Sequence, residues 1–233
     1  MTQMLEAQGV RKVFSGGDLE PVDVLGQVDL AVKRGEVVSI VGASGAGKST
    51  LLHLLGALDT PTEGEIWLDG TPYSTLAPDT RDGLRNRDIG FVFQFHHLLR
   101  DFTTLENVMM PLLIASVPER TARERASAML NSVGLNARLA HRPPQLSGGE
   151  QQRCAVARAL VSEPKVLLAD EPSGNLDHVH SAQLHELLFN IVREFETTLV
   201  VVTHNRELAE SADRILRLQD GRLAEAESSE VLI

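Results

Sequence analysis

Residues 42–50 read GASGAGKST, and this stretch decides the fold that the chain is expected to adopt. It fits the pattern G-x-x-x-x-G-K-[ST], follows the apolar run EVVSIV and leads into KSTLLHLLGAL, which has helical spacing. In this pattern, backbone N–H groups surround a phosphate chain, Lys48 reaches the β and γ oxygens, and the Ser49 hydroxyl ligates Mg²⁺. A glycine turn that binds nothing is the competing interpretation, and the order of strand, turn and helix argues against it. The predicted phosphate-binding residues are Gly42, Ala43, Ser44, Gly45, Ala46, Gly47, Lys48, Ser49 and Thr50.

Carboxylates follow a second apolar strand, VLLADEP. Asp170 stands where the strand ends and is predicted to hold the magnesium shell, while Glu171 is placed to deprotonate an attacking water. Paired acids at a strand end are often a helix cap, and the phosphate loop upstream makes that interpretation less attractive. A third strand, TTLVVVTH, ends at His204, which is predicted to contact the γ-phosphate. Five other histidines lack convincing ligand spacing and are expected to be surface or partner contacts: His96, His97, His178, His180 and His185.

The stretch QLSGGEQQR, residues 145–153, has the features of a second anion-binding helix start. Ser147 is a good N-cap, and Gly148 and Gly149 leave backbone N–H groups open to a ligand that approaches closely. An ordinary capped helix would explain Ser147 but not the two glycines beside it. The chain therefore carries two candidate phosphate cradles.

The composition of the chain restricts which classes of protein it can belong to. The chain has 233 residues, 42% hydrophobic residues and a formal net charge of -10, which suits one domain with a real core and argues against a nucleic-acid partner. Cys154 is the single cysteine, so an internal disulfide is excluded, and it is expected to be a small buried residue on a helix. The first residues lack the apolar segment of a secretory signal, and no apolar run approaches the length of a membrane span. We therefore expect a soluble protein that reaches a membrane only through a partner.

The pattern along the chain predicts an α/β sheet interrupted by helices. Strands are expected at residues 22–32, 36–42, 89–94, 165–170 and 197–204, with others at GEIWLDG and DRILRLQDGRL. Helical spacing dominates from Thr104 to about Ser162 and returns in SAQLHELLFNIVREF. The charged run at residues 78–88 needs no explanation beyond a solvated helix face.

Together these motifs resemble the ATP-binding subunits of ABC transporters over essentially the whole chain. The resemblance lies in GASGAGKST, FVFQ, LSGGEQQR, LLADEP, SGNLD and the final TH, in that order. It implies a P-loop NTPase (RecA-like) core, about residues 1–94 and 163–233, with an antiparallel β edge and an inserted α-helical subdomain, about residues 95–162. It also implies that Gln94 joins the Mg²⁺ shell and that Phe14 stacks on adenine where many relatives have tyrosine. Two subunits of such ATPases pair head to tail, so Ser147, Gly148, Gly149 and Asp177 would face the ATP of the partner subunit.

Within this family, LLHLLGALDTPTEGEIWLDG and QFHHLLRDFTTLENVMMPLL are similar to the LolD-type ATPases of bacterial lipoprotein-releasing complexes. That similarity implies permease partners, lipoprotein cargo and a peripheral place on the cytoplasmic face of the inner membrane. SGNLD is similar to the TGNLD motif that is common in a wider group of ATPases. That group also contains the macrolide-exporter (MacB) and cell-division (FtsE) ATPases, so both remain alternatives. Apolar residues after Gln94 favour a docking groove for the membrane partner, although they would also suit packing of the subdomain. The predicted docking residues are Phe95, Leu98, Leu99 and Phe102.

Two other classes of protein share part of this pattern. A P-loop kinase would use the same phosphate loop but has no use for LSGGE or SGNLD. A DNA-associated ABC ATPase would share every motif, but it calls for coiled-coil arms, zinc cysteines or a second cassette, which 233 residues and one cysteine do not accommodate.

Overall fold

The structure is a computed structural model that describes residues 3–15 and 20–227. The chain forms two compact units, and each is described by itself. The first contains Met1–Arg81, Leu168–Asp170 and Thr198–Ile233, and the second contains Asp82–Leu167 and Glu171–Thr197. The expected division into a core and a helical subdomain at residues 95–162 stays a prediction.

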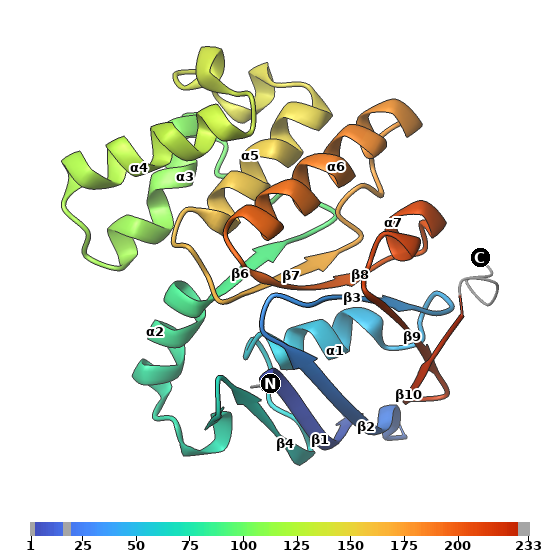
Figure 1. The fold of residues 1–233 in the computed structure, drawn as a ribbon. Helices are drawn as coiled ribbons and strands as arrows, with labels where there is room; N and C mark the ends of the chain where they lie inside the picture. Colours follow the sequence, from blue (N-terminus) through green and yellow to red (C-terminus); the bar gives the residue numbers. More distant parts are fainter. Residues whose placement is uncertain (1–2, 16–19, 228–233) are drawn as a thin grey trace. The chain divides into compact units, whose positions relative to one another are not determined.

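Two sheets make up the first unit (Figure 1). An antiparallel sheet has the order β2-β1-β4-β5, from β1 (Gln3–Phe14), β2 (Val22–Lys33), β4 (Glu63–Leu68) and β5 (Thr71–Pro72). The second sheet runs β10-β9-β3-β8-β7, from β3 (Val37–Val41), β8 (Thr198–Val202), β9 (Arg214–Gln219), β10 (Arg222–Glu225) and the end of β7 (Val166–Asp170). Strands β3, β8 and β9 are parallel, and β3 and β8 are buried along their whole length, as strands with both faces covered should be.

Short helices complete this unit. They are α1 (Lys48–Leu55), the 3₁₀ turn η1 (Tyr73–Thr75), the first turn of α2 (Pro78–Asp88) and α7 (Arg206–Glu210). Helix α1 buries its leucines at 51, 52, 54 and 55, which matches the helical spacing read from KSTLLHLLGAL.

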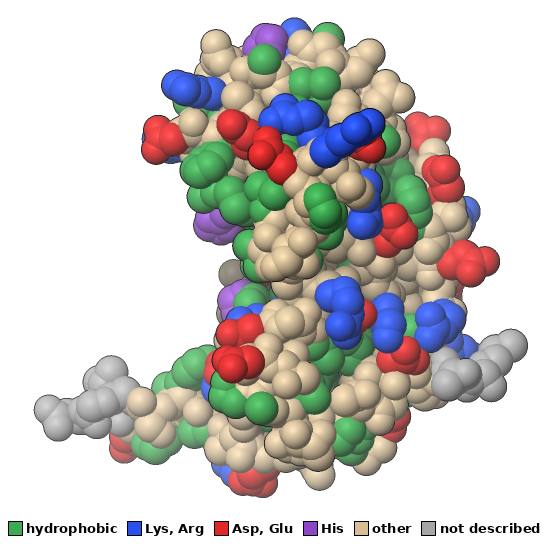
Figure 2. Space-filling model, turned by 90° about the vertical axis from the view of Figure 1, so that its left-hand side faces the viewer, with side chains coloured by type: hydrophobic (Ala, Val, Ile, Leu, Met, Phe, Trp, Pro, Cys, Tyr) green, Lys and Arg blue, Asp and Glu red, His purple; other side chains and the backbone are tan. Residues whose placement is uncertain are grey.

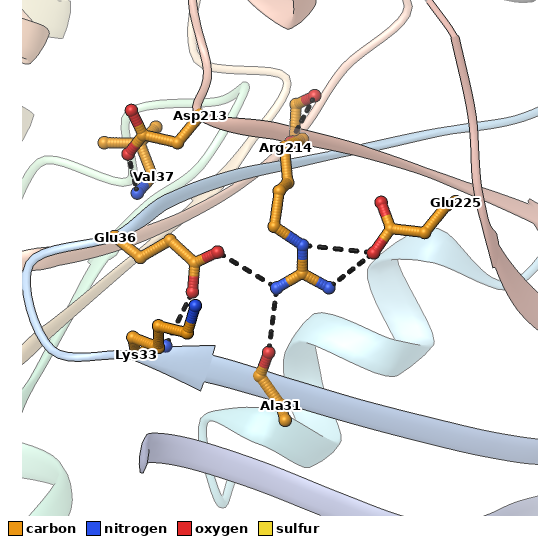
Figure 3. Close-up of polar contacts among 8 residues, drawn as sticks. Ala31, Lys33, Glu36, Val37, Asp213, Arg214 and Glu225 are labelled. Atoms are coloured by element: carbon orange, nitrogen blue, oxygen red, sulfur yellow. Dashed lines mark hydrogen bonds and ion pairs between the residues drawn. The ribbon is translucent and has the colours of Figure 1, made fainter. Parts of the chain in front are cut away.

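Arg214 links the two sheets of the first unit (Figure 3). Its Nη1 donates to the Ala31 carbonyl of β2 and to Glu36 Oε1, each at 3.0 Å, while Nε and Nη2 both donate to Glu225 Oε1 of β10. The hydrogen bonds to Glu225 and then to Glu36 raise the pKa of this guanidinium. Glu36 is buried, and its second oxygen accepts from the Lys33 backbone N–H at 2.7 Å. One arginine therefore satisfies a buried carboxylate and fixes the position of the β9–β10 hairpin against β2.

The second unit is mainly helical. It contains β6 (Ile89–Val92) beside β7, helices α3 (Thr104–Ile114), α4 (Glu119–Ser132), α5 (Gly148–Leu160) and α6 (His178–Glu194), and the 3₁₀ turns η2 (Asn136–Arg138) and η3 (Pro143–Gln145). Helices α3, α4 and α5 pack against one another, and α5 also packs against α6 and β6 (Figure 1). Cys154 is buried on α5, as expected, and burial raises the pKa of its thiol to about 12. Among the described residues, no helix is both long and apolar enough to cross a membrane.

Every strand that the sequence pattern proposed is present in the structure. Besides the two-residue strand β5, the pattern missed β1. Its sequence, QMLEAQGVRKVF, mixes apolar and charged residues without clean alternation. The register of β1 against β2 shifts at several points, so bulges displace the alternation between the two faces.

Candidate functional site

The phosphate loop of the first unit is built as the sequence predicts. It leaves the buried strand β3 at Gly42 and enters α1 at Lys48, with Gly47 at the helix N-cap. A side chain at Gly42 would overlap the carbonyl oxygen of Leu218, and one at Gly47, where φ is 95°, would come within 3.0 Å of Val24. These two glycines are therefore required by close approach of the backbone as well as by loop conformation.

Lys48 lies over this loop. Its Nζ donates to the carbonyl oxygens of Gly42 at 2.9 Å and of Ala43 at 3.0 Å, so the ammonium bridges the start of the loop. Because both acceptors are uncharged, this geometry holds a cation beside the open N–H groups of the α1 N-terminus, and the combination favours an anion. A cavity of about 510 Å³ opens next to the loop, between residues 43–46 on one side and residues 22–24 and 217–221 on the other.

Asp170 ends strand β7, and His204 follows the neighbouring strand β8. β8 pairs with β3 on one side and lies next to β7 on the other, so the strand that leads to His204 lies between the strand that leads to Lys48 and the strand that ends at Asp170. The Ser49 hydroxyl at the start of α1 and the Asp170 carboxylate at the end of β7 are hard oxygen donors of the kind that Mg²⁺ prefers, so this donor set fits the ion.

Phe14 ends β1, with its side chain 45% exposed. The Nζ of Lys12 lies 5.0 Å from the centre of its ring, and the same Nζ donates to Asp59 at 2.8 Å. A cation therefore covers one side of the ring, and the exposed remainder leaves surface on which a planar group can stack.

The LSGGE segment of the second unit is a capped helix start, which confirms the predicted N-cap. Ser147 Oγ accepts from the Glu150 backbone N–H at 3.2 Å, and Glu150 Oε2 accepts from the Ser147 backbone N–H at 2.8 Å. This capping box satisfies the N–H of the third helical residue and leaves those of Gly148 and Gly149 without partners inside the helix. Arg138 donates to the other oxygen of Glu150 at 2.8 Å. The Ser147 backbone bond and then the Arg138 bond lower the pKa of Glu150 to about 2.

The loop between β7 and α6, residues 171–177, carries the SGNLD motif. Glu171 begins it with a φ of 45°, and the Gly174 N–H donates to the Glu171 carbonyl at 3.0 Å. Asp177 ends it as the N-cap of α6, accepting from the His180 N–H at 3.0 Å and lying 2.6 Å from His180 Nδ1. Hydrogen bonds from the His180 N–H and ring lower the pKa of Asp177.

Gln94 is tied to this loop by two hydrogen bonds with Asn175. The Asn175 amide donates to the Gln94 carbonyl at 2.9 Å, and the Gln94 amide donates to Asn175 Oδ1 at 3.3 Å. Asn175 is part of SGNLD but is not among the predicted site residues, because nothing in the local pattern indicates which residue it binds.

The end of this loop and the start of α6 also lie against the signature glycines, Gly148 and Gly149 of LSGGE. A side chain added at Gly148 would have Leu176 Cδ2 at 3.8 Å, and one added at Gly149 would have His180 Cδ2 at 3.4 Å. Within the second unit, the structure thus brings together Gln94, the end of SGNLD and LSGGE.

The segment after Gln94 presents apolar side chains. Phe95 is 64% exposed, Leu99 and Phe102 are also exposed, and Leu98 is half-buried. Hydrophobic side chains also gather beside histidine on the face drawn in Figure 2. Helix α5 holds the backbone of this segment, since Arg158 donates to the carbonyls of His96 and His97 at 2.8 Å each. Gln152 of the same helix donates to the carbonyl of Phe93, just before Gln94, at 3.1 Å.

One histidine differs from its expectation. His185 is among the residues predicted to be surface or partner contacts, but α6 buries it, and its Nε2 lies 2.7 Å from Ser173 Oγ. The reason is its position in the helix: residues 181, 184, 185 and 188 lie on the packed face, so the spacing along α6 could have indicated burial.

Known proteins resemble the chain over nearly its full length. The ABC transporter family profile matches residues 25–174. The lipoprotein-releasing system ATP-binding protein LolD 2 of Chlorobaculum tepidum is 52% identical, over 94% of this chain and 91% of the relative. LolD of Xanthomonas campestris pv. campestris is 51% identical, over 98% of this chain and 95% of the relative.

Among solved structures, the dimeric ABC transporter cassette MJ0796 matches with a TM-score of 0.87 and 40% identity, over 96% of this chain and 99% of that one. A post-hydrolysis dimer of the same cassette, bound to ADP and Pi, matches with a TM-score of 0.87 and 39% identity. The phosphate loop, the capped LSGGE helix and these likenesses agree: this chain belongs to the ABC transporter family, as one of its ATP-hydrolysing, ATP-binding subunits.

Proposed function

We propose that this chain is the ATPase motor of a bacterial transporter that releases lipoproteins from the inner membrane. The support for the cargo is identity of about one half, over nearly the whole chain, with relatives named as lipoprotein-releasing ATP-binding proteins. The observation that carries the motor function is the capped LSGGE helix, which offers a second set of open N–H groups in a chain that already has a phosphate loop. An enzyme that works with one phosphate cradle, such as a P-loop kinase, has no use for the second.

In the first unit, the residues from Gly42 to Thr50 bind the phosphates of ATP. Lys48 exchanges its two carbonyl acceptors for β and γ oxygens, which carry full negative charge and are stronger partners for an ammonium group. Ser49 and Asp170 would hold Mg²⁺, and Gln94 is the further proposed ligand. When bound, the ion neutralises phosphate charge that develops during the reaction. Phe14 stacks on adenine and His204 binds the γ-phosphate.

Glu171 is the proposed general base. It follows Asp170 directly, and its φ of 45° ends the extended conformation of the strand at this residue. Glu171 orients the attacking water and accepts its proton, which a carboxylate can do and an amide cannot. Asn175 connects Gln94 to the same loop. A displacement of the loop when the γ-phosphate binds or leaves therefore also moves the segment after Gln94.

Two copies of the chain close head to tail around two ATP molecules. Ser147, Gly148 and Gly149 bind the γ-phosphate held by the partner, and Asp177 lies at the same boundary. The N-terminus of α5 carries a partial positive charge of roughly half an elementary charge. The γ-phosphate of the partner subunit balances this charge only while the nucleotide is bound. ATP therefore joins the copies, and hydrolysis allows them to separate.

The membrane partner docks on Phe95, Leu98, Leu99 and Phe102, and this peripheral contact places the chain at the cytoplasmic face of the inner membrane. Support comes from the exposed aromatic and aliphatic side chains, from the bonds of Arg158 to the backbone of this segment and from the bond of Gln152 to the backbone just before Gln94. Because those two residues lie on α5, a force on the docked segment reaches the helix that begins at LSGGE.

The test of the motor function is Glu171→Gln. The variant should bind ATP with Mg²⁺, lose nearly all hydrolysis and accumulate as a dimer that elutes earlier in size-exclusion chromatography. Glu196→Gln is a matched control, because Glu196 is an exposed glutamate of the same unit whose φ of 51° is also positive. Hydrolysis by Glu171→Gln at the rate of the control would refute the assignment.

The cargo is tested separately with the membrane proteins that co-purify from the host. Reconstituted with them, the chain should release a lipoprotein from vesicles only when ATP is hydrolysed. ATP-driven efflux of a macrolide without lipoprotein release would favour the exporter-like alternative, and failure of both with intact partner binding would favour the cell-division-like one.

A further inference from the structure

The loop of residues 171–177 is short, and both of its ends carry groups with proposed roles. Glu171 begins it, Asp177 caps α6 at its end, and Leu176 and His180 lie against the signature glycines. Two backbone bonds shape it, from Gly174 N–H to Glu171 O and from Leu176 N–H to Ser173 O, each at 3.0 Å. A displacement at its middle therefore reaches both ends.

Ser173 is at that middle point and is attached to α6. Its Oγ lies 2.7 Å from Nε2 of His185, which is seven residues into the helix, about two turns from its start. Both residues are only 6% exposed, so water does not offer Ser173 or the facing ring nitrogen an equivalent partner. Ser181 Oγ also approaches the Ser173 carbonyl, at 3.5 Å, which adds a second and longer contact between the same loop and helix.

We propose that His185 is a positioning residue for ATP hydrolysis. Through its bond to the Ser173 hydroxyl it holds the loop against α6, and so it fixes the direction in which Glu171 faces the water and the place at which Leu176 supports Gly148. The inference rests on the proposed role of Glu171 as general base. His185 itself does not touch the reacting atoms.

The loop is also where Gln94 is bound, which makes the position of Ser173 matter for coupling. A side chain at Gly174 would come within 2.9 Å of the Gln94 amide, and Asn175 holds Gln94 through two bonds. If the middle of the loop is released from α6, Gln94 and Glu171 lose their common support. The expected result is slower hydrolysis without weaker binding of ATP, because the phosphate loop belongs to the other unit.

The experiment compares His185→Leu, His185→Gln and Ser173→Ala with the unchanged chain. Leucine removes the bond and fills the space, while the glutamine amide reaches the place of Nε2 and can restore the bond. We expect His185→Leu and Ser173→Ala each to lower kcat for ATP hydrolysis about tenfold, the factor expected from one buried hydrogen bond, with KM for ATP within about twofold. His185→Gln should recover most of the rate. Gln183→Leu, an exposed position on the same helix, is the control for adding an apolar side chain.

A double-mutant cycle shows whether the two residues act as a pair. The variant carrying both His185→Leu and Ser173→Ala should be no slower than the slower single variant. Unchanged kcat in the single variants at a temperature well below their melting, or full additivity in the double variant, would overturn the proposal. If His185→Leu does not fold, Ser173→Ala and His185→Gln still decide between these outcomes.

The Glu171→Gln variant separates this inference from the assignment on which it rests. If Glu171→Gln hydrolyses ATP normally, the proposed base is wrong and the inference falls with it. If Glu171→Gln is inactive while the variants at positions 173 and 185 retain full activity, the base stands and only the positioning role of His185 is refuted.

Discussion

Replacing Glu150 by glutamine removes one negative charge from the start of the helix that carries LSGGE. Glutamine can still accept from the Ser147 N–H, so the capping box survives in outline, but the Arg138 bond loses its ionic character. The pKa of Glu150 is lowered from 4.5 to about 2. At 1.36 kcal/mol for each pKa unit, the ionised side chain contributes at most about 3 kcal/mol to the free energy of unfolding at neutral pH.

The direction of the pH dependence follows from this lowered pKa. The contribution is fully present above the unfolded pKa near 4.5 and is lost as the pH falls toward about 2. For these two values, about 2 kcal/mol should remain at pH 3.5. The stability difference between the unchanged chain and Glu150→Gln should therefore be largest at neutral pH and shrink below about pH 4.5.

Urea unfolding followed by far-UV circular dichroism measures this difference. Helix signal is preferable to tryptophan fluorescence because the single tryptophan, Trp67, lies in β4 of the other unit. Glu106→Gln is the matched control: Glu106 closes a capping box with Thr103 on α3, and its bonds to Thr103 lower its pKa, but among the described residues no arginine donates to it. Its loss should be smaller. A difference for Glu150→Gln that is absent at pH 7, or equally large at pH 3.5, would contradict the reasoning.

Two further variants test the second cradle and the docking segment. Gly148→Asp should fold, since an added Cβ meets only Leu176 at 3.8 Å. The variant should bind ATP as a monomer. In the Glu171→Gln background it should fail to dimerise, because the new carboxylate repels the γ-phosphate bound by the partner subunit. Loss of ATP from the monomer in equilibrium dialysis would show that the glycine acts within its own subunit. Phe102→Glu should leave ATP binding and the melting temperature of the isolated subunit unchanged and abolish co-purification with the membrane partner, whereas a lower melting temperature would mean that Phe102 packs the unit.

The sequence by itself determined the features that depend on neighbouring residues. The strand, glycine loop and helix at residues 36–58 and the N-cap at Ser147 are encoded within a few positions, because strands, turns and caps are local arrangements of backbone hydrogen bonds. Ordered motifs of this kind were enough to predict the family and the ATPase. The sequence was weakest where bulges interrupt alternation, as in β1.

Tertiary structure decided which distant groups share a bond. Arg214 reaches Ala31 across 183 positions and Glu36 across 178, and Asn175 reaches Gln94 across 81, distances over which periodicity carries no information about pairing. The pairing of His185 could not be predicted either, although its partner is only 12 residues away. The pattern of α6 can indicate that His185 is buried, but not that its ring contacts the Ser173 hydroxyl. A buried polar group must find a partner, and only the path of the chain through the packed unit determines which one is within reach.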